Sequence, residues 1–156
     1  MRSHRKIMNR SLSSILFICL ILPVSVLADD LIMRRIAMSF PEAMNALQTS
    51  IAEEGFTVSR VQRVDIGLTS SGYNTAEYRI VFFMRKDEVH HIVEEHYELI
   101  PFLPLKITIF AEGNETIIVT MNPNKLNEFF PDLKMGKEFA QWSDQVVRIL
   151  DRVQSE

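Results

Sequence analysis

Five side chains that could bind a metal ion lie close together in the sequence: His90, His91, Glu94, Glu95 and His96. On a helix, residues four positions apart lie on the same side, so His91 would meet Glu95 and His90 would meet Glu94. Zinc and copper accept both imidazole and carboxylate ligands in proteins. The spacing therefore makes His91 and Glu95 the candidate metal ligands, with His90 and Glu94 as helpers.

The same spacing also has a purely structural interpretation. Solvated pairs of histidine and glutamate are common on helix surfaces, and no third ligand follows from the spacing, whereas a catalytic zinc site needs three protein ligands. His96 falls on the apolar side of this segment, as is typical of a partly buried, hydrogen-bonded histidine. The sequence leaves both interpretations open.

Motifs for covalent or phosphate chemistry are not found elsewhere in the sequence. No serine lies in a Gly-x-Ser-x-Gly turn, and Ser39 is accounted for as a helix cap. The five glycines do not form a phosphate-binding loop. The sequence therefore indicates no catalytic residue and no cofactor, and favours a role other than catalysis.

The beginning of the chain has the pattern of a secretory signal peptide. Four basic residues precede an uncharged apolar run over residues 12–27, and Ala28 is followed by two aspartates. We expect cleavage after Ala28 and a periplasmic or secreted protein that meets a membrane only through residues 1–28 before cleavage. The alternative is an uncleaved anchor, but an anchor helix needs about 20 apolar residues, and this run is shorter and broken by Pro23.

Removal of residues 1–28 would leave an acidic chain without cysteine. It would leave 13 basic against 20 acidic residues, a net charge of −7, and it would remove Cys19, the single cysteine. An acidic chain without a basic cluster is not typical of nucleic-acid-binding proteins. A chain without cysteine forms no disulfide, so the hydrophobic core has to supply its stability.

Hydrophobic periodicity and turn residues divide the rest of the chain into strands and helices. Ser39 and Glu42 form a capping-box pattern at the start of a helix, and Gly113-Asn114 is typical of a hairpin turn. We expect strands over 31–38, 56–68 with a bulge near 60–63, 76–84, 105–112 and 116–121, and helices over 40–54, 89–100 and 137–154.

This order of elements predicts an α+β fold with a single domain over residues 29–156. We expect one antiparallel sheet of about five strands with two main helices on one face, in the order β-α-β-β-(short α)-β-β-α. In the strand over 76–84, alternation predicts that Ala76, Tyr78, Ile80, Phe82 and Met84 point inward. Because Val81 and Phe83 make the far end of this strand apolar on both faces, either helices or a partner chain should cover it.

Several of these segments resemble the domain-of-unknown-function 302 (DUF302) family. The resemblance lies in Gly55-Phe56 at a helix end, Leu103-Pro104 before the hairpin strand, Glu112-Gly113 beyond it and Asn122-Pro123 after the return strand. The resemblance implies a β-α-β(4)-α fold similar to that of the TATA-binding-protein-like group. It also implies that the chain forms a homodimer, and it implies no catalytic reaction.

Two departures from the family pattern limit what the resemblance implies. Many members have cysteine directly after the Leu-Pro pair, where this chain has Leu105, and Asn-Pro after the third strand, where this chain has Arg85-Lys86. Chemistry that depends on either feature is therefore not expected here.

Taken as a whole, the sequence predicts an exported, non-catalytic module that binds a small or apolar ligand or a partner protein and forms a homodimer. The alternative is a metal-binding or redox-linked periplasmic accessory protein that uses the His90 to His96 segment.

Overall fold

The computed structural model describes residues 30–156 of the chain. The expected signal peptide over residues 1–28 lies outside this range. The elements of the described chain are β1 (Leu31–Ile36), α1 (Phe40–Glu53), β2 (Thr57–Arg63), α2 (Val64–Ser70), β3 (Tyr78–Met84), α3 (Lys86–Glu95), η1 (Tyr97–Phe102), β4 (Leu105–Glu112), β5 (Glu115–Met121), η2 (Pro123–Lys125), α4 (Leu126–Phe129), η3 (Pro131–Leu133) and α5 (Gly136–Ser155).

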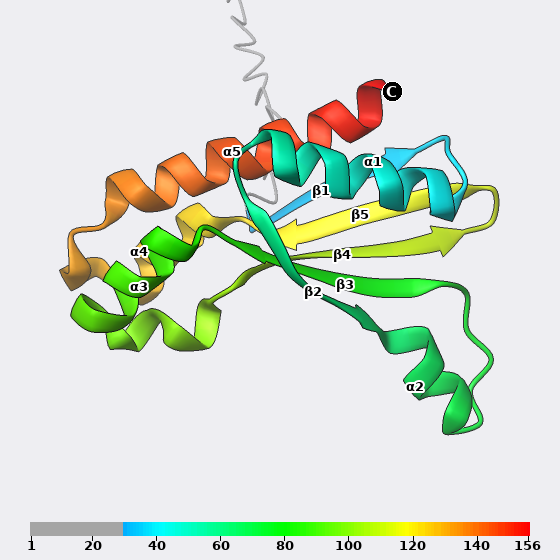
Figure 1. The fold of residues 1–156 in the computed structure, drawn as a ribbon, viewed down its shortest axis with the longest axis horizontal. Coiled ribbons are helices and arrows are strands. Elements are labelled where there is room, and N and C mark those ends of the chain that lie inside the picture. The colour runs from blue at the N-terminus through cyan, green and yellow to red at the C-terminus, as the bar shows by residue number, and fades with distance from the viewer. Residues whose placement is uncertain (1–29) are drawn as a thin grey trace, which may run out of the picture.

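The strands form one antiparallel sheet in the order β1-β5-β4-β3-β2. The long helices α1 and α5 pack against each other and lie on the same side of this sheet (Figure 1). This arrangement confirms the predicted α+β class with a single five-stranded sheet. In the part of the chain that the structure describes, no helix is long and apolar enough to cross a membrane.

Helix α1 begins as its sequence predicts. The Glu42 carboxylate accepts hydrogen bonds from the backbone amide of Ser39 at 3.1 Å and from its hydroxyl at 2.6 Å. Pro41 occupies the first turn, where no intrahelical bond is lost. Beyond the helix, Gly55 adopts a positive φ of 80°, which glycine reaches without a steric penalty.

The hairpin of β4 and β5 is also confirmed. Gly113 has a φ of 61° in the turn, and Ile109 pairs with Ile118 directly across the two strands. Ile107 and Ile109 are fully buried under the helices. The alternation of this strand therefore directs its aliphatic residues to the helix-covered face, which forms the main core.

The predicted strand over 56–68 is wrong in its second half. Pairing with β3 ends at Arg63, and Val64–Ser70 forms helix α2, in which no residue is buried. Alternation over Val64, Ile66 and Leu68 is too short to separate a strand from a helix turn. The irregularity in β2 is present, and it lies between Val58 and Arg60, slightly earlier than predicted.

The predicted inward face of β3 is also wrong. The residues that point toward the helices are Arg79, Val81 and Phe83, whereas Ala76 precedes the strand. Arg79 is 9% exposed, pairs with Asp65 of α2 and holds its guanidinium 5.4 Å from the centre of the Phe40 ring. Because a charged residue occupies a core position, the hydrophobic alternation of the sequence predicted the wrong face of β3 as the buried one.

The predicted helix over 89–100 divides into two elements. Helix α3 starts earlier, at Lys86, and ends at Glu95, and the 3-10 helix η1 follows from Tyr97. His96 lies between them in a non-helical conformation, with φ −136° and ψ 58°. The side chains near this end form a second core cluster that includes Leu99, Phe139 and Trp142.

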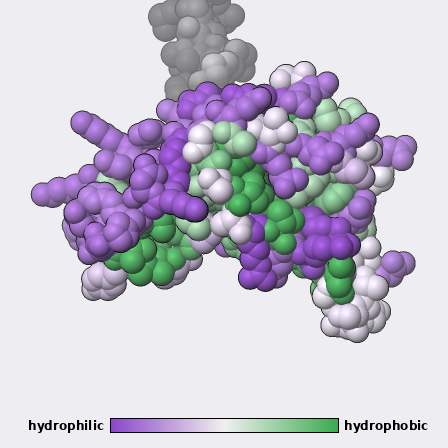
Figure 2. Space-filling view, viewed as in Figure 1, coloured by the Kyte–Doolittle hydropathy of each residue, from purple (hydrophilic) through white to green (hydrophobic). Residues whose placement is uncertain are grey.

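The sheet face opposite α1 and α5, here called the open face, also carries apolar side chains. Residues directly opposite each other in the pairing share a face, which places Met33 beside Val119 and Tyr78 beside Phe110. Its apolar members include Leu31, Met33, Tyr78, Ile80, Phe82, Phe110, Ile117 and Val119. Ile117 is already buried in the single chain, at 2% exposure. Leu31 and Met33 are each 57% exposed. In Figure 2 apolar residues gather in separate areas of a mainly hydrophilic surface, one of them over the strands.

Candidate functional site

Helix α3 brings the predicted His–Glu pairs together. His91 Nδ1 lies 3.2 Å from Glu95 Oε1, and His90 Nε2 lies 3.3 Å from Glu94 Oε1. All four side chains are more than half exposed. Among residues 30–156, no group of three or more His, Cys, Asp or Glu side chains is arranged to hold a metal ion. Each pair thus supplies two ligands, and the metal site stays a prediction.

A pocket of about 150 Å³ lies between α3 and α5, and we call it the α3–α5 pocket. Its lining residues are Glu88, His91, Ile92, His96, Met135, Glu138, Gln141 and Trp142. The structure therefore places two of the predicted histidines, His91 and His96, in one pocket wall, while His90, Glu94 and Glu95 are not part of its lining.

Helix α5 supplies the opposite wall because of its amphipathic pattern. Phe139, Val146 and Ile149 face the core and are almost completely buried. Trp142 is 5% exposed, and its ring lies 5.6 Å from that of Phe139. It lies at the border of the buried stripe, so it belongs both to the second core cluster and to the pocket.

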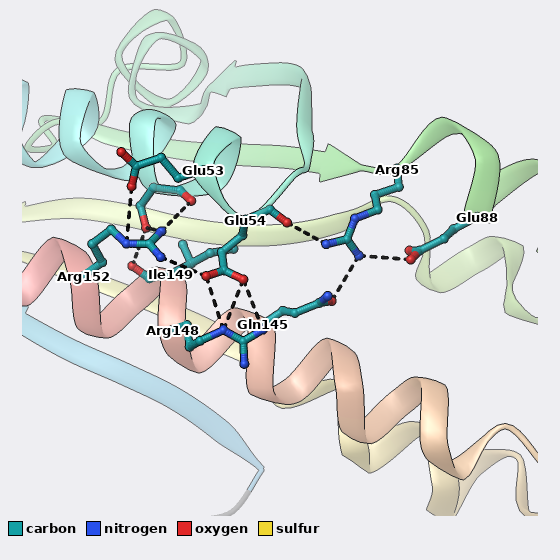
Figure 3. A network of polar contacts seen from close by, with 9 residues as sticks. Glu53, Glu54, Arg85, Glu88, Gln145, Arg148, Ile149 and Arg152 are labelled. Atoms are coloured by element: carbon teal, nitrogen blue, oxygen red, sulfur yellow. Dashed lines mark hydrogen bonds and ion pairs between the residues drawn. The ribbon is translucent and has the colours of Figure 1, made fainter.

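Arg85 fixes the wall of the pocket that Glu88 provides. Its guanidinium donates to the Glu88 carboxylate at 3.0 Å, to the side-chain oxygen of Gln145 at 3.2 Å and to the Glu54 carbonyl at 2.6 Å (Figure 3). The same guanidinium lies 4.0 Å from the centre of the Phe56 ring. Arg85 thereby joins the end of α1, the start of α3 and the middle of α5 into one rigid unit.

A second part of the same network joins α1 to α5. Glu54 accepts from Arg152 at 2.9 Å and forms an ion pair with Arg148 at 3.1 Å (Figure 3). Arg152 also donates to the Ser50 carbonyl, and the Ser50 hydroxyl donates to the Ile149 carbonyl. Burial opposes the charge of Glu54, but these hydrogen bonds and the attraction of the two arginines lower its pKa overall. This network is structural, because its donors and acceptors satisfy one another.

A different hollow lies at the edge of the open face. It measures about 320 Å³ and is lined by Thr75, Ala76, Glu77, Tyr78, Phe110 and Ala111. The rings of Tyr78 and Phe110 meet edge to face with their centres 6.0 Å apart. The hollow therefore has an aromatic wall that continues the apolar surface of the sheet.

The comparisons with known proteins agree with the fold. The sequence model of the family described as Domain of unknown function DUF302 matches residues 32–153. A crystal structure of an uncharacterized conserved protein DUF302 from Bacillus stearothermophilus superposes with a TM-score of 0.72 at 22% identity, over 79% of this chain and 97% of that one. No curated protein matches the sequence.

Proposed function

The chain belongs to the DUF302 family, and from that premise we propose that it is an exported, non-catalytic binding module whose open face binds a second copy of the chain. The family description names no activity, so the proposal depends on the surface of the molecule. The observation that carries it is the partly exposed apolar side of a sheet whose other side is already packed, with Leu31 and Met33 as its most exposed members.

Strand β5 supports this proposal most clearly. Ile118 faces the helices, and Ile117 and Val119 on either side of it face the opposite way. A continuous apolar run of this kind is typical of a strand that is covered on both faces. Leu31 and Met33 of the neighbouring strand β1 are more than half exposed, although they continue the same apolar surface.

A second copy of the chain suits this surface better than an unrelated partner. Sheets pack face to face about 10 Å apart through interlocking apolar side chains, and a two-fold axis uses the same patch on both subunits. The open face ends in charged residues, where Arg35 pairs with Glu112 and Glu115. The aromatic hollow beside Tyr78 and Phe110 offers space for a side chain of the second copy.

Export is the other part of the proposal. The first strand begins at Leu31. Cleavage after Ala28 would therefore leave every described strand and helix intact. Mass spectrometry of protein recovered outside the cytoplasm should give the mass of a chain that begins at Asp29. Recovery of the full-length chain would contradict cleavage.

Sedimentation equilibrium tests the self-association directly. We expect residues 29–156 to form dimers and the Met33→Glu variant to be monomeric, because the glutamate would bury a charge between two sheets. Thr49→Glu adds the same charge at an exposed position of α1 and should remain dimeric. A monomeric parent, or equal association of the two variants, would contradict the proposal.

The alternative function is a metal-binding or redox-linked periplasmic accessory protein. It is favoured by one observation, the 3.2 Å approach of His91 Nδ1 to Glu95 Oε1 on exposed helix surface. Zinc or copper titration followed by calorimetry should then give binding that His91→Ala abolishes. Equal metal uptake by parent and variant would exclude this site.

A further inference from the structure

The floor of the α3–α5 pocket is apolar although it faces solvent. Ile92, Met135 and Trp142 line it, and each is at least nine-tenths buried. An engineered apolar cavity of about 150 Å³ binds benzene, so the volume of about 150 Å³ found here fits a single ring. The floor therefore matches a ligand with a compact apolar body. Among residues 30–156, no three His, Cys, Asp or Glu side chains are arranged to hold a bare metal ion.

The rim of the pocket favours positive charge. Glu138 and Glu88 bring carboxylates to it, and Gln141 adds an amide oxygen. None of the eight lining residues in the described chain is lysine or arginine. The other two titratable lining residues are His96 and His91, and His91 pairs with Glu95 at 3.2 Å. Arg85 pairs with Glu88 from behind, at 3.0 Å, and offsets part of that charge. The remaining negative charge of the rim therefore comes from Glu138.

From these features we propose that the α3–α5 pocket binds a small organic cation, a ring-sized apolar body that carries an ammonium group. The ring would contact Ile92 and Met135, and the cation would lie beside Trp142 and the carboxylate of Glu138, which line the same pocket. Aromatic faces attract cations, and a carboxylate accepts the hydrogen bonds that an ammonium donates. The site shares no residue with the open face, so the proposal stands or falls independently of dimerisation.

The chain offers a site-specific signal for this test, because Trp142 is its only tryptophan. We would titrate residues 29–156 with benzylammonium chloride and follow tryptophan fluorescence. Benzyl alcohol and benzoate serve as probes of similar size that are neutral and negatively charged. We expect a saturable change with benzylammonium, binding of benzyl alcohol that is about fivefold weaker, and no binding of benzoate.

A matched pair of variants distinguishes the effect of the rim carboxylate from the effect of the net negative charge of the protein. Glu138→Gln removes the rim charge and should weaken benzylammonium binding about fivefold while leaving benzyl alcohol unchanged. Glu94→Gln removes an exposed charge of α3 outside the pocket and should leave both affinities unchanged. Circular dichroism confirms that both variants are folded.

Three outcomes would overturn the proposal. The first is equal affinity for benzylammonium and benzyl alcohol, and the second is an equal effect of the two variants. The third is the lack of a saturable change with any organic probe; if zinc chloride alone then gave a saturable change that His91→Ala abolished, the pocket would be a metal site instead.

Discussion

The apolar residues on the two faces of the sheet differ in how deeply they are buried. Along β3, Val81 and Phe83 are fully buried under the helices, whereas Ile80 and Phe82, which alternate with them, lie on the open face and stay partly exposed. On the edge strand β1 the contrast is larger, since Met33 is 57% exposed. The comparison teaches that hydrophobic content alone does not identify the core. The covered face supplies folding stability, and the open face retains apolar surface that can drive association.

The largest expected effect compares two leucines, one from each side of the molecule. In chains that also carry Met33→Glu, and are therefore expected to be monomeric, Leu47→Ala should reduce the free energy of unfolding by about 3 kcal/mol. Leu47 of α1 is fully buried, whereas Leu31 on the open face is 57% exposed. Leu31→Ala should therefore cost less than about 0.5 kcal/mol. Urea unfolding measures both values, and similar costs would remove the distinction between the faces.

A smaller effect is expected where the covered face is interrupted by charge. Arg79 pairs with Asp65, so Arg79→Met should cost about 2 kcal/mol because it leaves the Asp65 carboxylate partly buried without its partner. Burial raises the pKa of Asp65, but the hydrogen bond and charge of Arg79 outweigh it and lower the pKa. The double variant with Asp65→Asn should recover part of the loss. A double-mutant cycle in urea measures the coupling, and strictly additive costs would contradict it.

The smallest effect concerns pH and the seam between α1 and α5. The pKa of Glu54 is lower in the folded chain than its usual value of 4.5, so its contribution is complete above that value and disappears as the pH falls through the folded pKa. Unfolding in urea at pH 6 and pH 3 should therefore show a smaller loss of stability in Glu54→Gln than in the parent. An unchanged pH dependence would mean that Arg148 and Arg152 do not stabilise the carboxylate.

Local signals in the sequence predicted the fold correctly at positions whose backbone geometry requires particular residue types. Ser39 and Glu42 marked the start of α1, and Gly113 marked the hairpin turn, because these positions need a cap and a positive φ. The helix over 137–154 was also predicted from its hydrophobic periodicity, and α5 is present with Phe139 and Trp142 buried.

Predictions failed where tertiary contacts override a short pattern. Arg79 occupies a core position because Asp65 and the Phe40 ring satisfy its guanidinium, and this shifted the apparent phase of β3. Val64 continues the alternation of β2, but helix α2 starts there. Neither Asp65 nor Phe40 is adjacent to Arg79 in sequence, so alternation alone could not reveal the exception.

Only the α3 wall of the α3–α5 pocket could be predicted from the sequence. The sequence singled out His91 on the predicted helix as a candidate ligand, and the structure adds Glu138 and Gln141, which come from the far end of the chain. Their only signal in the sequence is their spacing from Trp142, since Gln141 is adjacent to it and Glu138 lies four positions before it. The packing of α5 beside α3, which no local pattern encodes, brings the two walls together.

The most direct test of the central claim is an isotope-filtered NMR experiment on a mixture of methyl-labelled and unlabelled copies of residues 29–156. Such an experiment detects only contacts between different copies. The proposed dimer predicts cross-peaks among methyl groups of the open face, including those of Leu31, Met33 and Val119. If no such cross-peaks appear at millimolar concentration, or if they arise only from residues outside the open face, the sheet does not bind a second copy there.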